Sequence, residues 1–198
     1  EKRGGKIAFP VNLSINEIAA HYHPTLEDNR VAEGLLKVDM GIHIDGYIAD
    51  TALSLDLTED GTYASLILAS EDALHEALLL LEENPTYHEI GKAIQTAIEK
   101  KGFSPIVNLS GHALGHYQIH AGKSIPNYGN NNNSYFDDGA YAVEPFSTTG
   151  EGMIMNGEPG NIYELIKKGS VRSPKAREVL QYIIEKYNTL PFSLREIQ

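Results

Sequence analysis

Two carboxylates, Asp39 and Asp50, lie on either side of an Asp45-Gly46 pair within residues 37–52. Asp-Gly is typical of a two-residue type I′ turn, because both central residues of that turn need positive φ. In a hairpin closed by this turn, Asp39 and Asp50 become diagonal neighbours on one face, about 7–8 Å apart at Cα. Two carboxylates so placed repel each other unless a cation lies between them. The hairpin therefore indicates a metal site.

The rest of the hairpin allows a second interpretation. Strand side chains alternate between two faces. One face is apolar and carries Val38, Met40, Ile42, Ile44, Tyr47, Ala49, Thr51 and Leu53. The other face carries Asp39, His43, Asp50 and Ser54. An amphipathic hairpin with a solvated acidic face would show the same pattern, so other residues must decide.

Residues 108–122 contain three histidines at intervals of four residues, His112, His116 and His120. A helix would stack them on one face. Three glycines oppose a helix, since each interior glycine costs about 0.5–1 kcal/mol relative to alanine; they are Gly111, Gly115 and Gly122. Loop and strand are therefore expected here, which gives each histidine a separate role.

A further carboxylate, Glu144, precedes Pro145 in a segment that predicts a strand over residues 140–146. Proline holds the preceding residue in extended geometry and removes one ladder donor, which suits a strand end or an edge that faces a site. Paired aspartates, a glycine-flanked histidine and an extended glutamate make a set of oxygen ligands with one imidazole. Such a set suits Mn, Fe, Co or Zn.

The elements that must position these residues follow from hydrophobic periodicity and cap residues. Strands are predicted over residues 6–11 and 35–57, with another near 19–22. Helices are predicted over residues 62–83, from a Thr86/Glu89 capping box to Gly102, and from Ser173-Pro174 onwards. Residues 127–134 are a loop on composition. Two helices behind a hairpin indicate an α/β (α+β) layer, and no linker divides the chain.

Composition excludes several classes of function. The formal charge is -11, from 16 basic and 27 acidic residues, and no basic cluster exceeds two residues, so nucleic acid is not an expected partner. The absence of cysteine leaves Asp, Glu and His as metal ligands and agrees with a reducing compartment. No apolar run approaches roughly 18 residues, so no membrane association is expected and a cytoplasmic location is predicted.

Four segments together resemble type 2 methionine aminopeptidases in order and in spacing: Phe9 to Tyr22, the hairpin, Asn108 to Gly122, and Tyr141 to Phe146. The resemblance covers nearly the whole chain. It implies the pita-bread fold, in which two pseudo-symmetric halves enclose a dinuclear metal site, and a single catalytic domain over residues 1–198. It also implies two divalent ions, which could be Co, Mn, Fe or Zn.

The resemblance assigns the metal ligands residue by residue. It implies that Asp39 chelates one ion, that Asp50 bridges both, and that His112 and Glu144 bind the other. By the same resemblance, a metal-bound hydroxide attacks the scissile carbonyl while Glu144 accepts the proton. His120 would stabilise the tetrahedral intermediate from outside the metal shell.

The substrate site follows from the same resemblance. His21 matches a second substrate-facing histidine and is also expected to be catalytic. Phe9 and Ile119 match residues that line the methionine pocket, although core packing explains an apolar residue at either position equally well. Three further histidines match no functional position and are expected to be structural or exposed: His23, His43 and His116.

The expected function is removal of the initiator methionine from nascent proteins whose second residue is small, by a metalloexopeptidase. A peptide or nascent-protein N-terminus would be its substrate, and the chain is expected to be a monomer. Two alternatives stay open. One is a non-catalytic pita-bread protein that binds partners, and the other is a prolidase-like Xaa-Pro peptidase.

The chain departs from the family pattern near its end. Residues 173–198 resemble the beginning of the helical insert of type 2 enzymes, whereas most of the insert and the closing strand with a fifth, bridging glutamate ligand have no counterpart. The chain also begins at Glu1 without a methionine. A protein of only these residues is therefore expected to bind metal weakly and to be inactive, whereas a protein that also carries those segments is expected to be an active enzyme.

Overall fold

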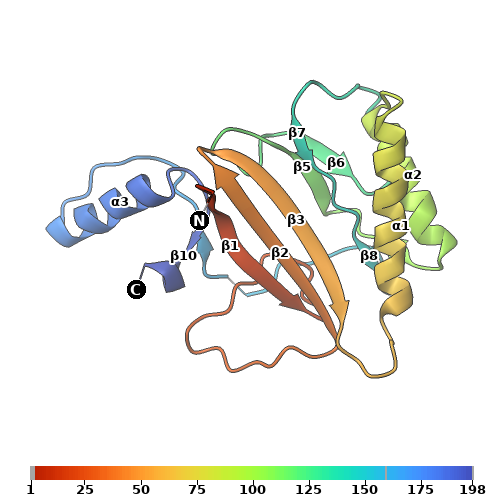
Figure 1. Ribbon diagram of the computed structural model, residues 1–198, viewed down its shortest axis with the longest axis horizontal. Helices are drawn as coiled ribbons and strands as arrows, with labels where there is room; N and C mark the ends of the chain where they lie inside the picture. Colours follow the sequence, from red (N-terminus) through yellow and green to blue (C-terminus); the bar gives the residue numbers. More distant parts are fainter. Residues whose placement is uncertain (1–2, 159, 198) are drawn as a thin grey trace. The chain divides into compact units, whose positions relative to one another are not determined.

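The computed structural model describes residues 3–158 and 160–197 (Figure 1). Its backbone contacts form two compact units, each assembled from segments that are distant in sequence. Unit 1 contains Glu1–Leu53, Gly115–Ile119 and Glu158–Gln198, and unit 2 contains Ser54–Leu114 and His120–Gly157.

The sheet of unit 1 contains the predicted hairpin. Its strands are β1 (Lys6–Ile15), β2 (Leu35–Ile44) and β3 (Tyr47–Asp56), in the order β1-β2-β3 (Figure 1). Asp45 has φ 48° and Gly46 has φ 87°, so both turn residues have the positive φ that a type I′ turn requires. The predicted hairpin is confirmed.

Of the two faces of the hairpin, the face with the carboxylates is the more buried. On the face with the carboxylates, His43 is only 2% exposed, and Asp39 and Asp50 are half-buried. On the apolar face, Ile42 is 56% exposed and Tyr47 is 75% exposed. The interpretation as an amphipathic hairpin with a solvated acidic face is therefore wrong.

The strand predicted near residues 19–22 is not formed, and this prediction is wrong. Asn16 has φ 47° and His21 has φ 61°, so the chain turns at both positions instead of running extended. Two backbone hydrogen bonds tie this loop to β1, from the Leu13 N–H group to the Tyr22 carbonyl at 2.7 Å and from the Ile18 N–H group to the Ile15 carbonyl at 3.0 Å. The segment is therefore a loop held to β1 and not a strand.

The remainder of unit 1 contains β9 (Ile162–Tyr163), α3 (Pro174–Lys186), β10 (Phe192–Ser193) and the short 3₁₀ helix η1 (Leu194–Glu196). Ser173 caps α3, because its side chain accepts a hydrogen bond from the Ala176 N–H group and Pro174 occupies the first turn. The predicted start of this helix is confirmed. The helix itself has no buried residue, whereas Tyr187, at its end, is buried.

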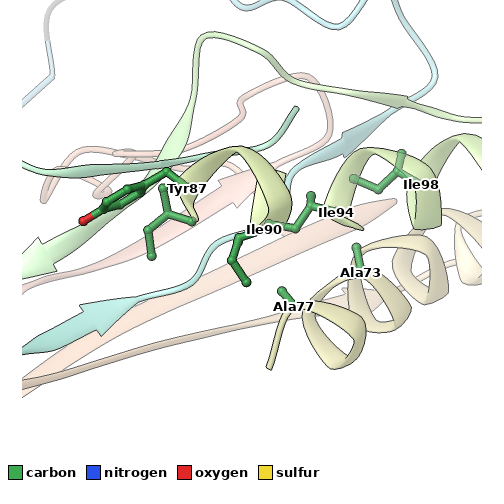
Figure 2. Close-up of a cluster of buried hydrophobic side chains, with 7 residues drawn as sticks. Ala73, Ala77, Tyr87, Ile90, Ile94 and Ile98 are labelled. Carbon is green, nitrogen blue, oxygen red and sulfur yellow. The ribbon is translucent and has the colours of Figure 1, made fainter. Parts of the chain in front are cut away.

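Unit 2 is built on α1 (Ala64–Leu81) and α2 (Tyr87–Lys100). The predicted capping box at the start of α2 is confirmed, with Thr86 and Glu89 bonded to each other's backbone N–H groups. The two helices share a core of buried side chains, six of which are labelled in Figure 2: Ala73, Ala77, Tyr87, Ile90, Ile94 and Ile98, with Ile125 completing the cluster. Both predicted helices are confirmed.

Two small sheets complete unit 2. One has the order β6 (Ser124–Pro126), β5 (Ser110–Leu114), β7 (Ala140–Ala142), and the other pairs β4 (Ser104–Pro105) with β8 (Ser147–Thr148). The expectation of strand and loop around the three histidines is confirmed. The strand predicted over residues 140–146 is shorter than expected, because Pro145 has no N–H group with which to continue the ladder.

Among the helices that the structure describes, none combines the length and the apolar character needed to cross a membrane.

Candidate metal centre

The hairpin of unit 1 presents two carboxylates from adjacent strands, Asp39 from β2 and Asp50 from β3. Asn12 of β1 pairs with Asp39 across the sheet. Its side chain is 3% exposed, and within the described residues its Oδ1 atom has no hydrogen-bond partner. A buried acceptor beside half-buried carboxylates is an electronegative setting that a cation would relieve.

His112 and Glu144 are brought together within unit 2. His112 pairs with Ala142 across β5 and β7, and its Nε2 atom lies 3.0 Å from the Glu144 Oε1 atom. The contact depends on Gly111, where a Cβ atom would lie 2.3 Å from the Ala142 carbonyl oxygen and 3.0 Å from the Glu144 backbone nitrogen. Only glycine lets the segment that carries Glu144 approach β5 this closely.

The chain that follows Glu144 is anchored to α1. The Ser147 hydroxyl donates a 3.0 Å hydrogen bond to the Leu66 carbonyl oxygen and lies 2.7 Å from the Ser70 hydroxyl oxygen. Leu66 and Ser70 are one helical turn apart. The helix therefore fixes the backbone three residues beyond the candidate ligand Glu144.

The two histidines expected to face substrate belong to different units. His120 lies in unit 2, is exposed, and contacts the His112 ring edge-on, with ring centroids 4.4 Å apart. His21 lies in unit 1 and is also exposed. His120 is thus adjacent to the candidate ligand pair, within reach of a group bound there.

Phe9 and Ile119, the residues expected to line a methionine pocket, are both buried in unit 1. The Phe9 ring covers Gly41 of β2, where a Cβ atom would lie 2.2 Å from the ring carbon Cε1. This burial agrees with a pocket wall and with ordinary core packing.

The three histidines expected to be structural or exposed have backbone partners. His43 is buried and accepts a 3.1 Å hydrogen bond at Nδ1 from the Gly46 N–H group, while His116 is exposed and donates to the Asp45 carbonyl at 2.6 Å. His23 donates to the Val11 carbonyl at 2.7 Å. Burial lowers the pKa of His43, and Lys6 lowers it further, although Asp45 opposes the shift. The ring is therefore held neutral beneath the turn.

Two positions that the sequence did not single out support the candidate ligands. Tyr117 donates a 2.9 Å backbone hydrogen bond to the Gly46 carbonyl, and its ring occupies the space that a Cβ atom at Gly46 would need. Asn127 is fully buried beside the segment that carries Glu144. An asparagine directly after a short apolar strand, rather than within the loop that follows, was the available signal for the second.

The donor atoms on these residues fit divalent metal binding. Unit 1 offers two carboxylates on one face of a hairpin, and unit 2 offers an imidazole and a carboxylate whose ligand atoms are 3.0 Å apart. Oxygen donors with imidazole and no thiolate suit Mn, Fe, Co and Zn. The arrangement can bind a divalent ion and can accept or donate a proton at Glu144.

Comparison with known sequences agrees with this chemistry. The sequence pattern of metallopeptidase family M24 matches residues 1–176. The methionine aminopeptidase of Methanocaldococcus jannaschii is 47% identical over 195 residues, which are 97% of this chain and 66% of the relative. That of Pyrococcus horikoshii is 46% identical over 199 residues, 98% of this chain and 67% of the relative. The chain thus spans about two thirds of the length of these relatives.

Solved structures show the same fold. A thermophilic Arx1 superimposes with a TM-score of 0.76 over 97% of this chain and 62% of its own, at 19% identity. The methionine aminopeptidase of Thermotoga maritima superimposes with a TM-score of 0.65 over 75% of this chain and 60% of its own, at 26% identity. These similarities confirm the expected α/β pita-bread fold and the expected resemblance to methionine aminopeptidases, which are metalloexopeptidases.

Proposed function

The chain belongs to metallopeptidase family M24, and from this premise we propose that it removes the initiator methionine from proteins whose second residue is small. The observation that carries the proposal is the contact between His112 and Glu144, an imidazole and a carboxylate 3.0 Å apart in a partly buried setting. The relatives at 47% and 46% identity are methionine aminopeptidases.

Four side chains would hold two divalent ions, with Co, Mn, Fe or Zn as candidates. Asp39 and Asp50 would serve from the hairpin, and His112 and Glu144 from unit 2. When bound, such ions supply Lewis acidity to the scissile carbonyl and lower the pKa of a water molecule. The burial of the carboxylate face of the hairpin supports this assignment, because removing carboxylates from water is costly and a bound cation would offset that cost.

Protein side chains supply the proton transfers and the binding contacts. Glu144 has a second carboxylate oxygen besides the one next to His112, and this oxygen can accept the proton of the attacking water. The exposed His120 can donate a hydrogen bond to the carbonyl oxygen as negative charge develops on it. His21 would provide a second contact to substrate, and Phe9 and Ile119 would form the apolar wall for the methionine side chain.

The substrate would be a peptide or a nascent-protein N-terminus in the cytoplasm, and the enzyme would act as a monomer. The net charge of -11 disfavours nucleic acid as an alternative ligand. Residues 173–198, which include helix α3 with no buried residue, would be the beginning of the helical insert of type 2 enzymes.

A peptide assay after metal removal tests the proposal. The full-length protein is stripped with EDTA, reloaded with Co²⁺ or Mn²⁺, and incubated with Met-Ala-Ser, Ala-Ala-Ser or Ala-Pro. Metal-dependent release of methionine from Met-Ala-Ser, with little release from the other two peptides, is the expected result. Cleavage of Ala-Pro alone would support a prolidase instead. No metal uptake and no cleavage of any peptide would support a non-catalytic binding protein.

A further inference from the structure

A buried amide lies beside the ligand pair and has no part in the chemistry proposed above. Asn127 is 0% exposed, and its Nδ2 group donates a 3.0 Å hydrogen bond to the Leu109 carbonyl oxygen. Its Oδ1 atom accepts a 3.4 Å hydrogen bond from the Phe146 N–H group. Burying an amide is costly unless its polar atoms are paired. Here each end pairs with the backbone of a different segment.

These two segments carry the candidate ligands. Leu109 lies three residues before His112, and Phe146 lies two residues after Glu144. Asn127 itself follows β6, which pairs with β5 on the side opposite β7. Its side chain therefore connects one edge of the three-stranded sheet of unit 2 to the segment that leaves the other edge.

Backbone pairing alone does not hold the segment around Glu144. Strand β7 ends at Ala142, and Pro145 has no N–H group to donate. The next N–H group along the chain belongs to Phe146, and Asn127 accepts it. The Phe146 carbonyl in turn accepts a 2.9 Å hydrogen bond from the Ile106 N–H group. Both backbone groups of Phe146 are thereby fixed, one of them by a side chain.

Packing does not explain an amide at position 127. A leucine would fill a similar volume, but it would leave the Leu109 carbonyl and the Phe146 N–H group unpaired, at a cost of about 1–3 kcal/mol each. The planar amide also sets its donor and its acceptor at a fixed separation. It can act as a spacer of defined length between the two segments.

We propose that Asn127 is a positioning residue, which holds His112 and Glu144 at the separation that lets them share a divalent ion. The purpose of this positioning rests on the proposed function, whereas the positioning itself can be measured without metal. Supporting contacts of this kind, when removed, lower metal affinity by about 10- to 100-fold. Their removal also leaves a site looser by about 1 Å.

The first experiment measures the pair in the metal-free protein. Crystal structures of the wild type and N127L are compared with that of N108L. Asn108 is a matched control, because its Nδ2 and Oδ1 atoms bond the Ile154 carbonyl and N–H groups at 2.8 Å each, in a segment ten residues beyond Glu144. The distance between His112 Nε2 and Glu144 Oε1 should widen in N127L only. A folded N127L that keeps the wild-type distance would overturn the proposal.

The second experiment measures Co²⁺ affinity by titration calorimetry, alongside the visible absorption of the bound Co²⁺ and the melting temperature of the metal-free protein. N127L should bind Co²⁺ about 10- to 100-fold more weakly than N108L and should show an altered spectrum. Equal affinities and spectra would overturn the proposal, even with a lowered melting temperature, because a purely structural role predicts only that change.

The proposal stays testable if N127L does not fold or if the wild type binds no Co²⁺. Should N127L fail to fold, the isosteric N127D keeps an acceptor for Phe146 and loses the donor to Leu109. It should shift the distance and the affinity in the same direction, and unchanged values would overturn the proposal. A wild type that binds no Co²⁺, together with a widened pair in N127L, would refute the proposed function and support the positioning role.

Discussion

The His112 Nε2 atom lies 3.0 Å from the Glu144 Oε1 atom, across a strand pairing that itself ends two residues before Glu144. An imidazole and a carboxylate at this distance can share a proton or a cation. Backbone pairing of β5 with β7 fixes the position of His112. The position of Glu144 depends instead on Gly111, Ser147 and Asn127.

Replacing Glu144 by glutamine should abolish most of the activity. The amide keeps the shape of the side chain but cannot accept a proton, and general-base catalysis contributes about 10²- to 10⁴-fold. The kcat for Met-Ala-Ser should fall by that factor at saturating Co²⁺. The exposed Glu151, seven residues further on, provides the control, and E151Q should retain wild-type kcat. Full activity of E144Q would remove Glu144 from the mechanism.

Adding a methyl group at Gly111 should displace Glu144. The Cβ atom would lie 2.3 Å from the Ala142 carbonyl oxygen, which is backbone and cannot move aside without parting β5 from β7. Overpacking of this kind costs about 1–3 kcal/mol. Gly111→Ala should lower both the urea midpoint and the Co²⁺ affinity. Gly139→Ala meets its nearest atom at 3.6 Å and should change neither.

Any side chain at position 46 should destabilise the hairpin turn and lower the free energy of unfolding. An alanine there would have positive φ, which costs roughly 1–2 kcal/mol, and would collide with the Tyr117 ring at 2.3 Å. Gly61→Ala carries the same backbone strain, with its nearest atom 3.9 Å away. The difference in unfolding free energy between the two variants isolates the contact with Tyr117. Equal destabilisation would show that Tyr117 does not brace the turn.

The capping box of α2 should make stability depend on acid pH. The Thr86 backbone N–H group, followed by the Thr86 hydroxyl, lowers the pKa of Glu89 below its ordinary value of 4.5. A carboxyl whose pKa is lower in the folded state contributes stability above pH 4.5 and loses it as the pH falls through the folded value. Urea midpoints at pH 7 and pH 3 should differ less in Glu89→Gln than in the wild type. An unchanged difference would contradict this contribution.

Lys37 should likewise make stability rise with pH, in the alkaline range. Burial lowers its pKa from 10.5 to about 8, although Glu17 raises it, and the amine donates a 2.7 Å hydrogen bond to the Asn16 carbonyl. Between these two values the unfolded chain binds the proton and the folded chain does not, so stability rises with pH. The rise from pH 8 to pH 10 should be smaller in Lys37→Met. A rise of the same size would exclude Lys37 as its source.

Short-range sequence signals made several elements of the fold predictable. The turn at Asp45-Gly46 follows from the φ preference of two adjacent residues, and the start of α2 follows from Thr86 and Glu89 bonding to each other's backbone. Both signals lie within a few residues of chain and need no tertiary information. The ligand types were also visible, whereas their assignment to a metal came from a family resemblance.

Tertiary structure decided the rest. Alternation showed that the hairpin has two faces but could not show which one is covered, and the acidic face proved to be the more buried. A strand was predicted near His21, but the left-handed residues Asn16 and His21 turn the chain there. Composition assigned Asn127 to a loop. Its full burial and its two backbone partners depend on segments distant in sequence, so composition could not predict them.

The left-handed backbone of His21, with φ 61°, sets two goals of protein engineering against each other. Glycine would adopt this conformation without the roughly 1–2 kcal/mol that other residues lose there. A screen for thermal stability would therefore favour glycine at this position, whereas the substrate contact proposed for His21 means that a screen for turnover would retain the imidazole. Libraries intended to improve either stability or turnover should hold position 21 constant, so that the other property is not lowered unnoticed.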